Sequence, residues 1–251
     1  MNTDLQLPEK KVHRYYKYHA INRWLIDLLV HNSWYFAKPE QLNDPFDCRI
    51  DLRMAITRAV RTASSESKKA YQRILDQDEN RFLTNWEQKV STVGICAFSR
   101  AKCQELLWAH YADNHRGVCL KYEFDNDIIL AKENTFIGGG PITYENDALT
   151  RWLIDAPVGH RDEFLFGLIK RYLTIKAKAW RYEQEARFIR FDPGPFALPP
   201  STLTQVVFGI RTPNSDVVLI KKLAKDYSNC ESFYRVDQSN SDFGLTLRPL
   251  E

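Results

Sequence analysis

Alternating hydrophobic and polar positions divide this chain of 251 residues into short strands and amphipathic helices. Successive side chains of a strand point to opposite faces, and strands are rich in aromatic and β-branched residues. On this pattern we predict strands at residues 12–19, 33–37, 93–99, 117–124, 142–144, 180–189, 204–210 and 232–236. Apolar residues three or four positions apart predict helices at residues 20–31, 101–113, 149–154, 162–178 and 212–227.

Residues 51–90 have a helical composition but few apolar positions. We predict two solvent-facing helices there, at about 51–63 and 66–88, as an insertion that covers one end of the sheet. Together the elements predict a single α+β domain over residues 1–251, with a central, mostly antiparallel sheet and flanking helices. A split sheet stays open as an alternative to a continuous one.

The stretch at residues 180–189 has the most unusual pattern, because a strand there sends three charged side chains to one face. The apolar face would hold Trp180, Tyr182, Ala186 and Phe188, and the polar face Glu183, Glu185 and Arg187. Such a polar face either forms a charge ladder in solvent or lines a cleft. We keep both interpretations at this point.

Other polar positions also have a structural and a functional interpretation. Asn43 and Asp44 stand just before a proline and favour a turn held by side-chain-to-backbone hydrogen bonds, or else they line a site. Ser99 is placed to cap the helix predicted at 101–113, and His110 within that helix is either a structural histidine or a proton-transfer residue. Three glycines at 138–140 precede a proline, which favours a turn over a phosphate loop.

Composition excludes several classes of protein. The net charge of +3, from 35 basic and 32 acidic residues, does not indicate a surface that neutralises phosphates. The five cysteines are odd in number and widely spread, so we expect reduced thiols and a cytoplasmic location. They lack the spacing of a structural zinc site, and no metal is expected. No apolar run reaches about 18 residues, so we expect no membrane partner.

Four segments together resemble a bacterial family known as domain of unknown function 2971. They are YKY at 16–18, LNDPFD at 42–47, the run at 98–118 that ends in LWAHYADNHRGV, and KAWRYEQEAR at 178–187. Their order and spacing match across about residues 14–210. The resemblance implies membership of the family, but it implies no chemistry because the function of the family is not assigned.

A weaker resemblance is to the ADP-ribosyltransferase superfamily, whose split sheet surrounds a cleft for NAD. Members have a basic or aromatic residue on the first strand, a Ser or Tyr on a middle strand and a Glu on a late strand. Lys17 or Tyr18, Ser99 and Glu185 would take these positions, and Glu183 competes for the last one. The essential acid would stabilise the oxocarbenium-like state that forms when the nicotinamide bond breaks.

This resemblance implies NAD as the substrate and assigns roles to residues of this chain. The implied catalytic residues are Glu185, Glu183, His110 and Ser99. The implied ligand-binding residues are Tyr16, Lys17, Tyr18, Asn43, Asp44, Trp108, Tyr111 and Arg187. Aromatic rings among them would stack on nicotinamide, and Lys17 or Arg187 would pair with the pyrophosphate.

Three functional hypotheses therefore stand. The first is an NAD-consuming transferase or glycohydrolase of a bacterial toxin–antitoxin or phage-defence system, with a protein or nucleic-acid acceptor and a neutralising partner protein. The second is a metal-dependent nuclease or hydrolase, with ligands drawn from Asp44, Asp47, His110, Glu183 and Glu185. The third is a module that binds a nucleotide, a dinucleotide or a protein without catalysis.

Overall fold

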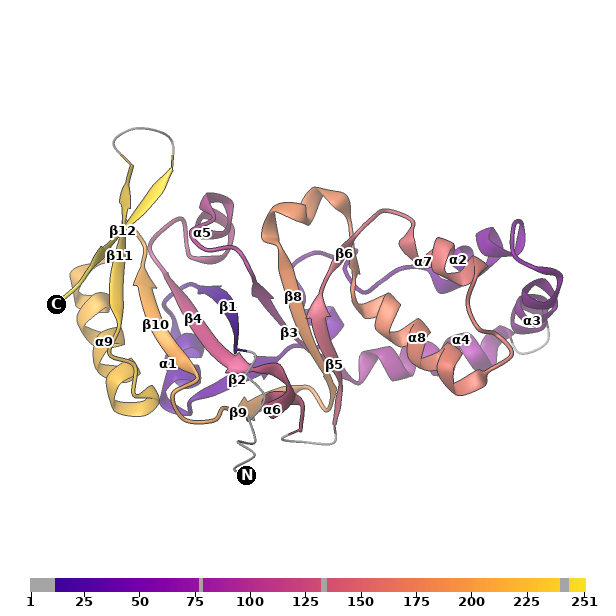
Figure 1. Ribbon diagram of the computed structural model, residues 1–251, viewed down its shortest axis with the longest axis horizontal. Coiled ribbons are helices and arrows are strands. Elements are labelled where there is room, and N and C mark those ends of the chain that lie inside the picture. The colour runs from indigo at the N-terminus through magenta and orange to yellow at the C-terminus, as the bar shows by residue number, and fades with distance from the viewer. Residues whose placement is uncertain (1–11, 77–78, 132–134, 240–243) are drawn as a thin grey trace, which may run out of the picture. The chain divides into compact units, whose positions relative to one another are not determined.

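The computed structural model describes residues 12–76, 79–131, 135–239 and 244–251 (Figure 1). Contacts divide the chain into two compact units, each made of segments that are distant in sequence. Unit 1 comprises Met1–Ser33, Arg100–Asn134 and Ala197–Glu251, and unit 2 comprises Trp34–Ser99 and Thr135–Phe196. Unit 2 is therefore built from two separate segments of the chain, and both contribute residues to the candidate site described below.

The described residues of unit 1 form five strands in the order β12-β11-β10-β4-β1. Their bounds are Val12–His19 (β1), Val118–Asp125 (β4), Leu203–Phe208 (β10), Phe233–Gln238 (β11) and Leu245–Pro249 (β12). Strands β10 and β11 pair in parallel, because the helix α9 (Asn214–Ser228) connects them and returns the chain to the same end. The other pairs of this unit are antiparallel.

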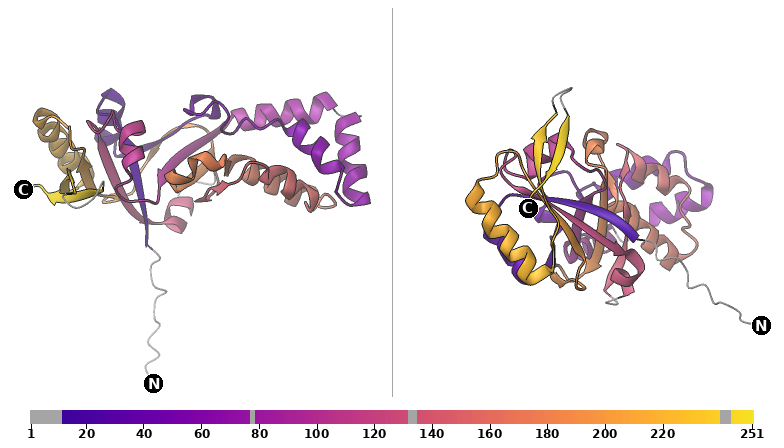
Figure 2. Two further views of the ribbon diagram at one scale, coloured as in Figure 1. Left: turned by 90° about the horizontal axis from the view of Figure 1, so that it is seen from above. Right: turned by 60° about the vertical axis from the view of Figure 1, so that its left-hand side comes forward.

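The helices of unit 1 are short except for α9. Helix α1 (Arg23–Val30) begins after Asn22, whose side-chain oxygen accepts hydrogen bonds from the backbone of Trp24 and Leu25. It lies alongside α9 (Figure 2). Helices α5 (Glu105–Tyr111) and α6 (Asn126–Ala131) flank β4 in the sequence. Within the described ranges, no helix is both long and apolar enough to cross a membrane.

Unit 2 is built on the antiparallel strands β3 (Val93–Ser99), β8 (Glu185–Phe191) and β5 (Phe136–Pro141), with β8 in the middle. Two smaller pairs accompany them. Strands β6 (Thr143–Tyr144) and β7 (Ile175–Lys176) pair in parallel, and β2 (Ser33–Phe36) pairs with β9 (Gly194–Ala197). The short turns η1 (Pro39–Gln41) and η2 (Lys178–Glu183) are 3₁₀-helical.

The described part of unit 2 also contains five helices: α2 (Leu52–Val60), α3 (Ser65–Asp76), α4 (Glu79–Ser91), α7 (Ala148–Ile154) and α8 (Arg161–Leu173). One buried cluster joins side chains of α2, α3, α4, α7 and α8 to β3 and β8. The helices at 51–91 are thus part of the core of unit 2, with Ile56, Tyr71 and Trp86 buried. The prediction of two solvent-facing helices is wrong in number and in burial, because few but well-spaced apolar residues are enough to form a buried face.

The mixed helix and strand composition and the mostly antiparallel pairing are confirmed, and β1 and β3 have the predicted bounds. The turn predicted at the three glycines is wrong, since Gly138, Gly139 and Gly140 belong to β5 and pair with β8. A Cβ atom on Gly139 would lie 2.8 Å from the ring of Phe188. The missing side chain therefore lets that ring pack directly against the neighbouring strand.

Candidate functional site

The stretch at residues 180–189 is divided by a turn and is not one strand as predicted. Residues Lys178–Glu183 form η2, Gln184 follows in the left-handed region with φ 46°, and β8 begins at Glu185. Alternation within β8 still separates Arg187 from Phe188, which packs on Trp34 and Phe98. The predicted separation of polar and apolar side chains thus holds within β8. It is wrong for Trp180, which lies in the turn and whose ring centre is 4.9 Å from Lys176 Nζ.

Five buried charged side chains meet in unit 2, and we call them the charge cluster: Asp47, Lys176, Glu183, Glu185 and Arg187. The ammonium of Lys176 lies at the centre of three carboxylates. Its Nζ is 2.5 Å from Glu183 Oε2, 3.0 Å from Glu185 Oε2 and 3.6 Å from Asp47 Oδ2. The cluster joins the segment before α2, the strand β7, the end of η2 and the start of β8.

Arg187 supplies the second cation of the charge cluster. Its Nε donates to Glu185 Oε1 at 2.5 Å, and its Nη2 donates to Asp47 Oδ2 at 2.5 Å. Its Nη1 donates to the carbonyl of Leu173 at 2.9 Å and lies 3.2 Å from Cys48 Sγ. All three guanidinium nitrogens therefore have partners, which is the condition under which a buried arginine is tolerated.

The charge cluster is not a ladder in solvent, because none of its five residues is more than 5 % exposed. That interpretation of residues 180–189 is wrong, since the strand faces the interior of unit 2 on both sides. Three carboxylates face two cations, so the cluster has one excess negative charge when every group is ionised. An anionic site of this kind favours a positive charge that develops beside it.

The neighbours of Glu185, Lys176 and Arg187 hold these three members of the cluster in their ionised forms. Burial alone would raise the pKa of Glu185, but Arg187 and Lys176 hold it below its usual value of 4.5. Burial would lower the pKa of Lys176, yet the carboxylates of Glu185 and Glu183 raise it to about 12. Burial also opposes the charge on Arg187, and Glu185 and its other neighbours raise its pKa well above the usual value. Glu185 is thus a carboxylate at neutral pH.

Ser99 lies directly opposite Glu185 in the register of β3 and β8. Its hydroxyl donates to the backbone carbonyl of Glu183 at 2.7 Å. The prediction that Ser99 caps the following helix is wrong, because α5 begins only at Glu105 and Gln104 precedes it. Tyr144 also contacts this edge of the cluster, since its hydroxyl accepts a 2.5 Å hydrogen bond from the backbone N–H of Glu185.

The turn at residues 42–48 brings Asp47 into the charge cluster. Asp44 is buried, and its Oδ1 accepts a hydrogen bond from the backbone of Phe46 at 2.9 Å, which confirms the turn interpretation. Asn43 is exposed beside it. Cys48 follows in the left-handed region with φ 54°, and burial raises the pKa of its thiol to about 12. Cys48 is therefore a buried neutral contact of Arg187 and not a nucleophile.

The remaining predicted site residues belong to unit 1. Tyr16 and Tyr18 are buried on one face of β1, and Lys17 between them is partly exposed. The hydroxyl of Tyr18 accepts from the backbone N–H of Gln104 at 3.2 Å, and its ring meets Trp108 edge-on at 5.2 Å. Trp108 is fully buried, so these two aromatic residues contribute to the core of unit 1.

His110 and Tyr111 lie at the end of α5 in unit 1. His110 is exposed, Tyr111 is partly exposed, and their ring centroids are 6.3 Å apart. The backbone then passes through three left-handed residues, Asp113, Asn114 and His115, before β4 begins. The ring of His115 stacks on Trp108 at 6.3 Å.

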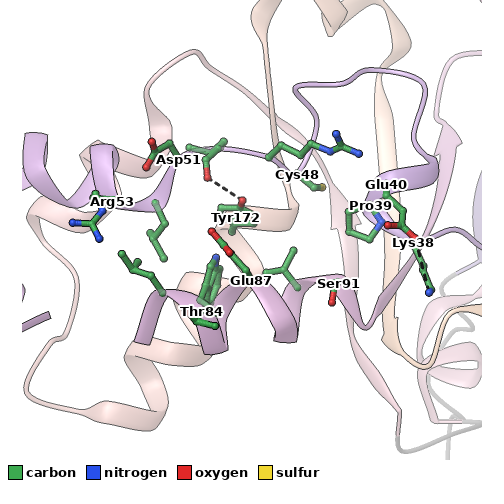
Figure 3. A pocket seen from close by; sticks show the side chains of 16 residues that line it. Lys38, Pro39, Glu40, Cys48, Asp51, Arg53, Thr84, Glu87, Ser91 and Tyr172 are labelled. Carbon is green, nitrogen blue, oxygen red and sulfur yellow. Dashed lines mark hydrogen bonds and ion pairs between the residues drawn. The ribbon is translucent and has the colours of Figure 1, made fainter. Parts of the chain in front are cut away.

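An open cleft of about 700 Å³ lies in unit 2 (Figure 3). It is lined by residues 38–40, by residues 48–53, by one face of α4 and by Tyr172. Figure 3 shows Arg53 toward one end of the cleft and Lys38 toward the other, with Thr84, Glu87 and Ser91 projecting from α4. Cys48 is the residue that this cleft shares with the surroundings of the charge cluster.

Lys176, the central cation of the cluster, is not among the site residues predicted from the sequence. It was included in the predicted helix at 162–178, whereas α8 ends at Leu173 and a two-residue strand carries Lys176 inward. Lysine is among the residue types least often buried, so no local pattern marks this position. The acids that surround it are distant in sequence or lie beyond the helix end, and only the fold brings them together.

The described residues include no group of three His, Cys, Asp or Glu side chains arranged to hold a metal ion. Three of the ligands that the metal hypothesis names lie close together, namely the carboxylates of Asp47, Glu183 and Glu185. The ammonium of Lys176 lies among them. This lysine therefore takes the place that a hard cation would need.

The chain was compared with models of known protein families. Residues 107–188 match the family model described as "Protein of unknown function (DUF2971)". This range runs from α5 to β8 and contains four of the five cluster residues, all except Asp47. Comparisons with curated proteins and with solved structures gave no significant match, so the resemblance to ADP-ribosyltransferases gains no support from them.

Proposed function

We propose that the chain is an NAD-consuming enzyme, a glycohydrolase or an ADP-ribosyltransferase, with Glu185 as its essential acid. The observation that carries the proposal is the position of Ser99 directly opposite Glu185 on paired strands. These are two of the three positions that the resemblance to ADP-ribosyltransferases assigned from the sequence. Glu185 is also ionised, as an acid that stabilises a cationic transition state must be.

The proposed reaction breaks the bond between the ribose C1′ and the nicotinamide nitrogen. The bonding electrons leave with nicotinamide, and positive charge develops on C1′ and the ring oxygen. The excess negative charge of the charge cluster stabilises this state. Water, or a hydroxyl or amine of a protein or nucleic-acid acceptor, then bonds to C1′ and loses a proton to solvent.

The proposal requires the cluster to open. Glu185 is 4 % exposed, and both of its oxygens accept hydrogen bonds from Arg187 and Lys176. Of these two partners, Lys176 has the flexible side chain, and its ammonium also lies 4.9 Å from the centre of the Trp180 ring. We propose that the substrate displaces the ammonium of Lys176 while Arg187 keeps Glu185 in place.

The test is NAD turnover by the purified chain, measured as released nicotinamide with and without candidate protein and nucleic-acid acceptors. Glu185→Gln should lower turnover by about a hundredfold or more, in line with the loss of one preorganised electrostatic partner. Glu163→Gln, an exposed acid of α8 in the same unit, should leave it unchanged. The proposal fails if the wild-type chain releases no nicotinamide, or if folded Glu185→Gln matches it.

A second candidate function is the binding of a nucleotide or protein without catalysis. The observation that favours it is the complete pairing of Glu185 inside a closed cluster, since such a cluster also serves as a rigid support. Calorimetry distinguishes the two candidates. NAD that binds and is recovered intact supports the second candidate, whereas release of nicotinamide supports the first. A defence role with a neutralising partner protein belongs to the first candidate and would appear as growth arrest on expression of the chain.

A further inference from the structure

The ammonium of Lys176 lies against an aromatic ring as well as among carboxylates. Its Nζ is 4.9 Å from the centre of the Trp180 ring, a distance at which the face of an indole attracts a cation. Trp180 belongs to η2 and is partly exposed, whereas Lys176 is 5 % exposed. One side of the buried cation is therefore formed by a residue that solvent reaches.

Two tyrosines extend this aromatic side of the charge cluster. The ring centroids of Trp180 and Tyr182 are 6.0 Å apart, and Tyr182 is also partly exposed. Burial raises the pKa of Tyr182 and Glu183 raises it further, while Lys176 lowers it, so both charges act on its hydroxyl. Tyr144 lies beside Lys176 in the register of β6 and β7. Aromatic side chains and carboxylates around one ammonium are the composition of a site for an organic cation.

The carboxylates determine which ligand can replace the ammonium of Lys176. With the ammonium in place, three carboxylates face two cations, and without it they would face Arg187 alone. The excess would rise to two negative charges in a buried site, where unpaired charge is costly. A neutral ring leaves this excess unchanged, whereas a positively charged ring restores one pairing. The site therefore favours a cation over a neutral molecule of the same shape.

We propose that Trp180 and Lys176 make the site specific for a planar cationic ring, the pyridinium of oxidised NAD, over the neutral dihydropyridine of NADH. The inference rests on the proposed function, since it names the part of the substrate that replaces the ammonium. Trp180 would receive the ring on the side that now contacts Lys176, and Glu183 and Glu185 would face its charge. Trp180 thereby takes the role that the resemblance implied for aromatic residues of unit 1.

Two rings that differ in charge test the inference on the full chain. 1-Methylnicotinamide is a pyridinium cation and nicotinamide is its neutral counterpart, and neither has a ribose that the proposed reaction could release. Ligand-observed nuclear magnetic resonance measures both affinities. The cation should bind tenfold or more tightly than nicotinamide, and NAD should bind tenfold or more tightly than NADH. In the nitrogen-15-labelled chain, the cation should shift the indole N–H signal that Trp180→Phe removes.

Variants of the ring measure its contribution. Trp180→Leu should lower the affinity for 1-methylnicotinamide tenfold or more, whereas Trp180→Phe keeps an aromatic face and should retain most of the preference for the cation. Trp24→Leu is the matched control. Trp24 of α1 is an exposed tryptophan with the Arg23 guanidinium 5.1 Å from its ring centre, and its replacement should leave both affinities unchanged.

Lys176→Ala removes the cation that the chain itself supplies, so the folded variant should bind 1-methylnicotinamide tenfold or more tightly than the wild type does. Where this variant does not fold, the Trp180 variants decide. Binding of neither ring, equal affinity for both, or an unchanged preference in Trp180→Leu would overturn the inference even if NAD is cleaved. A preference for the cation that Trp180→Leu abolishes supports the inference even if no nicotinamide is released, and only the proposed cleavage then fails.

Discussion

The two units bury polar groups in different ways. Unit 2 buries seven charged side chains among its described residues, and the five that form the charge cluster each have at least one ion-pair partner at 3.0 Å or less. Unit 1 has no buried charged side chain among its described residues. Its buried ring nitrogens His19 Nε2, Trp108 Nε1 and His115 Nδ1 have no hydrogen-bond partner in the described part of the chain, and the same holds for Trp86 Nε1 in unit 2. An unpaired buried charge costs far more than an unpaired neutral donor or acceptor. The difference shows that unit 2 depends on electrostatic pairing and unit 1 on keeping its histidines neutral.

The largest effect should follow from removing one cation of the charge cluster. Arg187→Met keeps an unbranched apolar side chain but leaves three carboxylates with Lys176 alone, so we expect the free energy of unfolding to fall by about 3–5 kcal/mol. Urea unfolding measures this loss. Arg161→Met, at the exposed start of α8, should change stability by less than about 0.5 kcal/mol. A loss below about 1 kcal/mol for Arg187→Met would mean that unit 2 does not depend on this pairing.

The response to acid should begin in unit 1. Burial lowers the pKa of His19 from 6.5 to about 3, so the unfolded chain binds a proton between these values that the folded chain does not. Stability is complete above pH 6.5 and is lost as the pH falls, by about 2 kcal/mol at pH 5. His19→Phe should remove this part of the pH dependence. Hydrogen exchange of β1 and β4, measured at pH 7 and pH 5, tests it, and equal protection of the wild type at both pH values would contradict it.

We expect the stability of unit 2 to fall at low pH and again at high pH. Because the folded-state pKa of Glu185 is lowered, its contribution is present above pH 4.5 and is lost as the pH falls through the lower folded value. The pKa of Lys176 is raised from 10.5 to about 12, so its contribution is present below pH 10.5 and is lost as the pH rises through 12. That second loss amounts to about 2 kcal/mol.

Hydrogen exchange of β8 distinguishes the losses of stability of unit 2 at low and high pH from the loss that His19 causes in unit 1. Protection of β8 should be constant between about pH 5 and pH 10, and Lys176→Met should abolish its loss at high pH. If β8 loses protection near pH 6 together with β1, the two units respond as one and the comparison between them fails.

Sequence patterns gave much of the local structure and little of the site. Alternation located β1 and β3 with their correct ends, because both strands are long enough for the period to be read. It failed at residues 178–184, where a 3₁₀ turn and the left-handed Gln184 interrupt a stretch that still alternates. It also gave Glu183, Glu185 and Arg187 as a group but not Lys176 or the role of Asp47. Those two join the cluster through tertiary contacts, which no local period encodes.

The smallest predicted effect distinguishes a structural role of Ser99 from a catalytic one. Ser99→Ala removes a buried neutral hydrogen bond to the Glu183 carbonyl, so stability should fall by about 1 kcal/mol. Ser91→Ala removes a similar hydrogen bond, to the carbonyl of Gln88, at an exposed position and should cost less. The rate of NAD turnover per folded molecule, compared between Ser99→Ala and the wild type, then distinguishes a structural role of Ser99 from a catalytic one. If Ser99 only supports the end of η2, turnover by Ser99→Ala follows its stability. If it acts on the substrate beside Glu185, turnover falls at temperatures where the variant is fully folded.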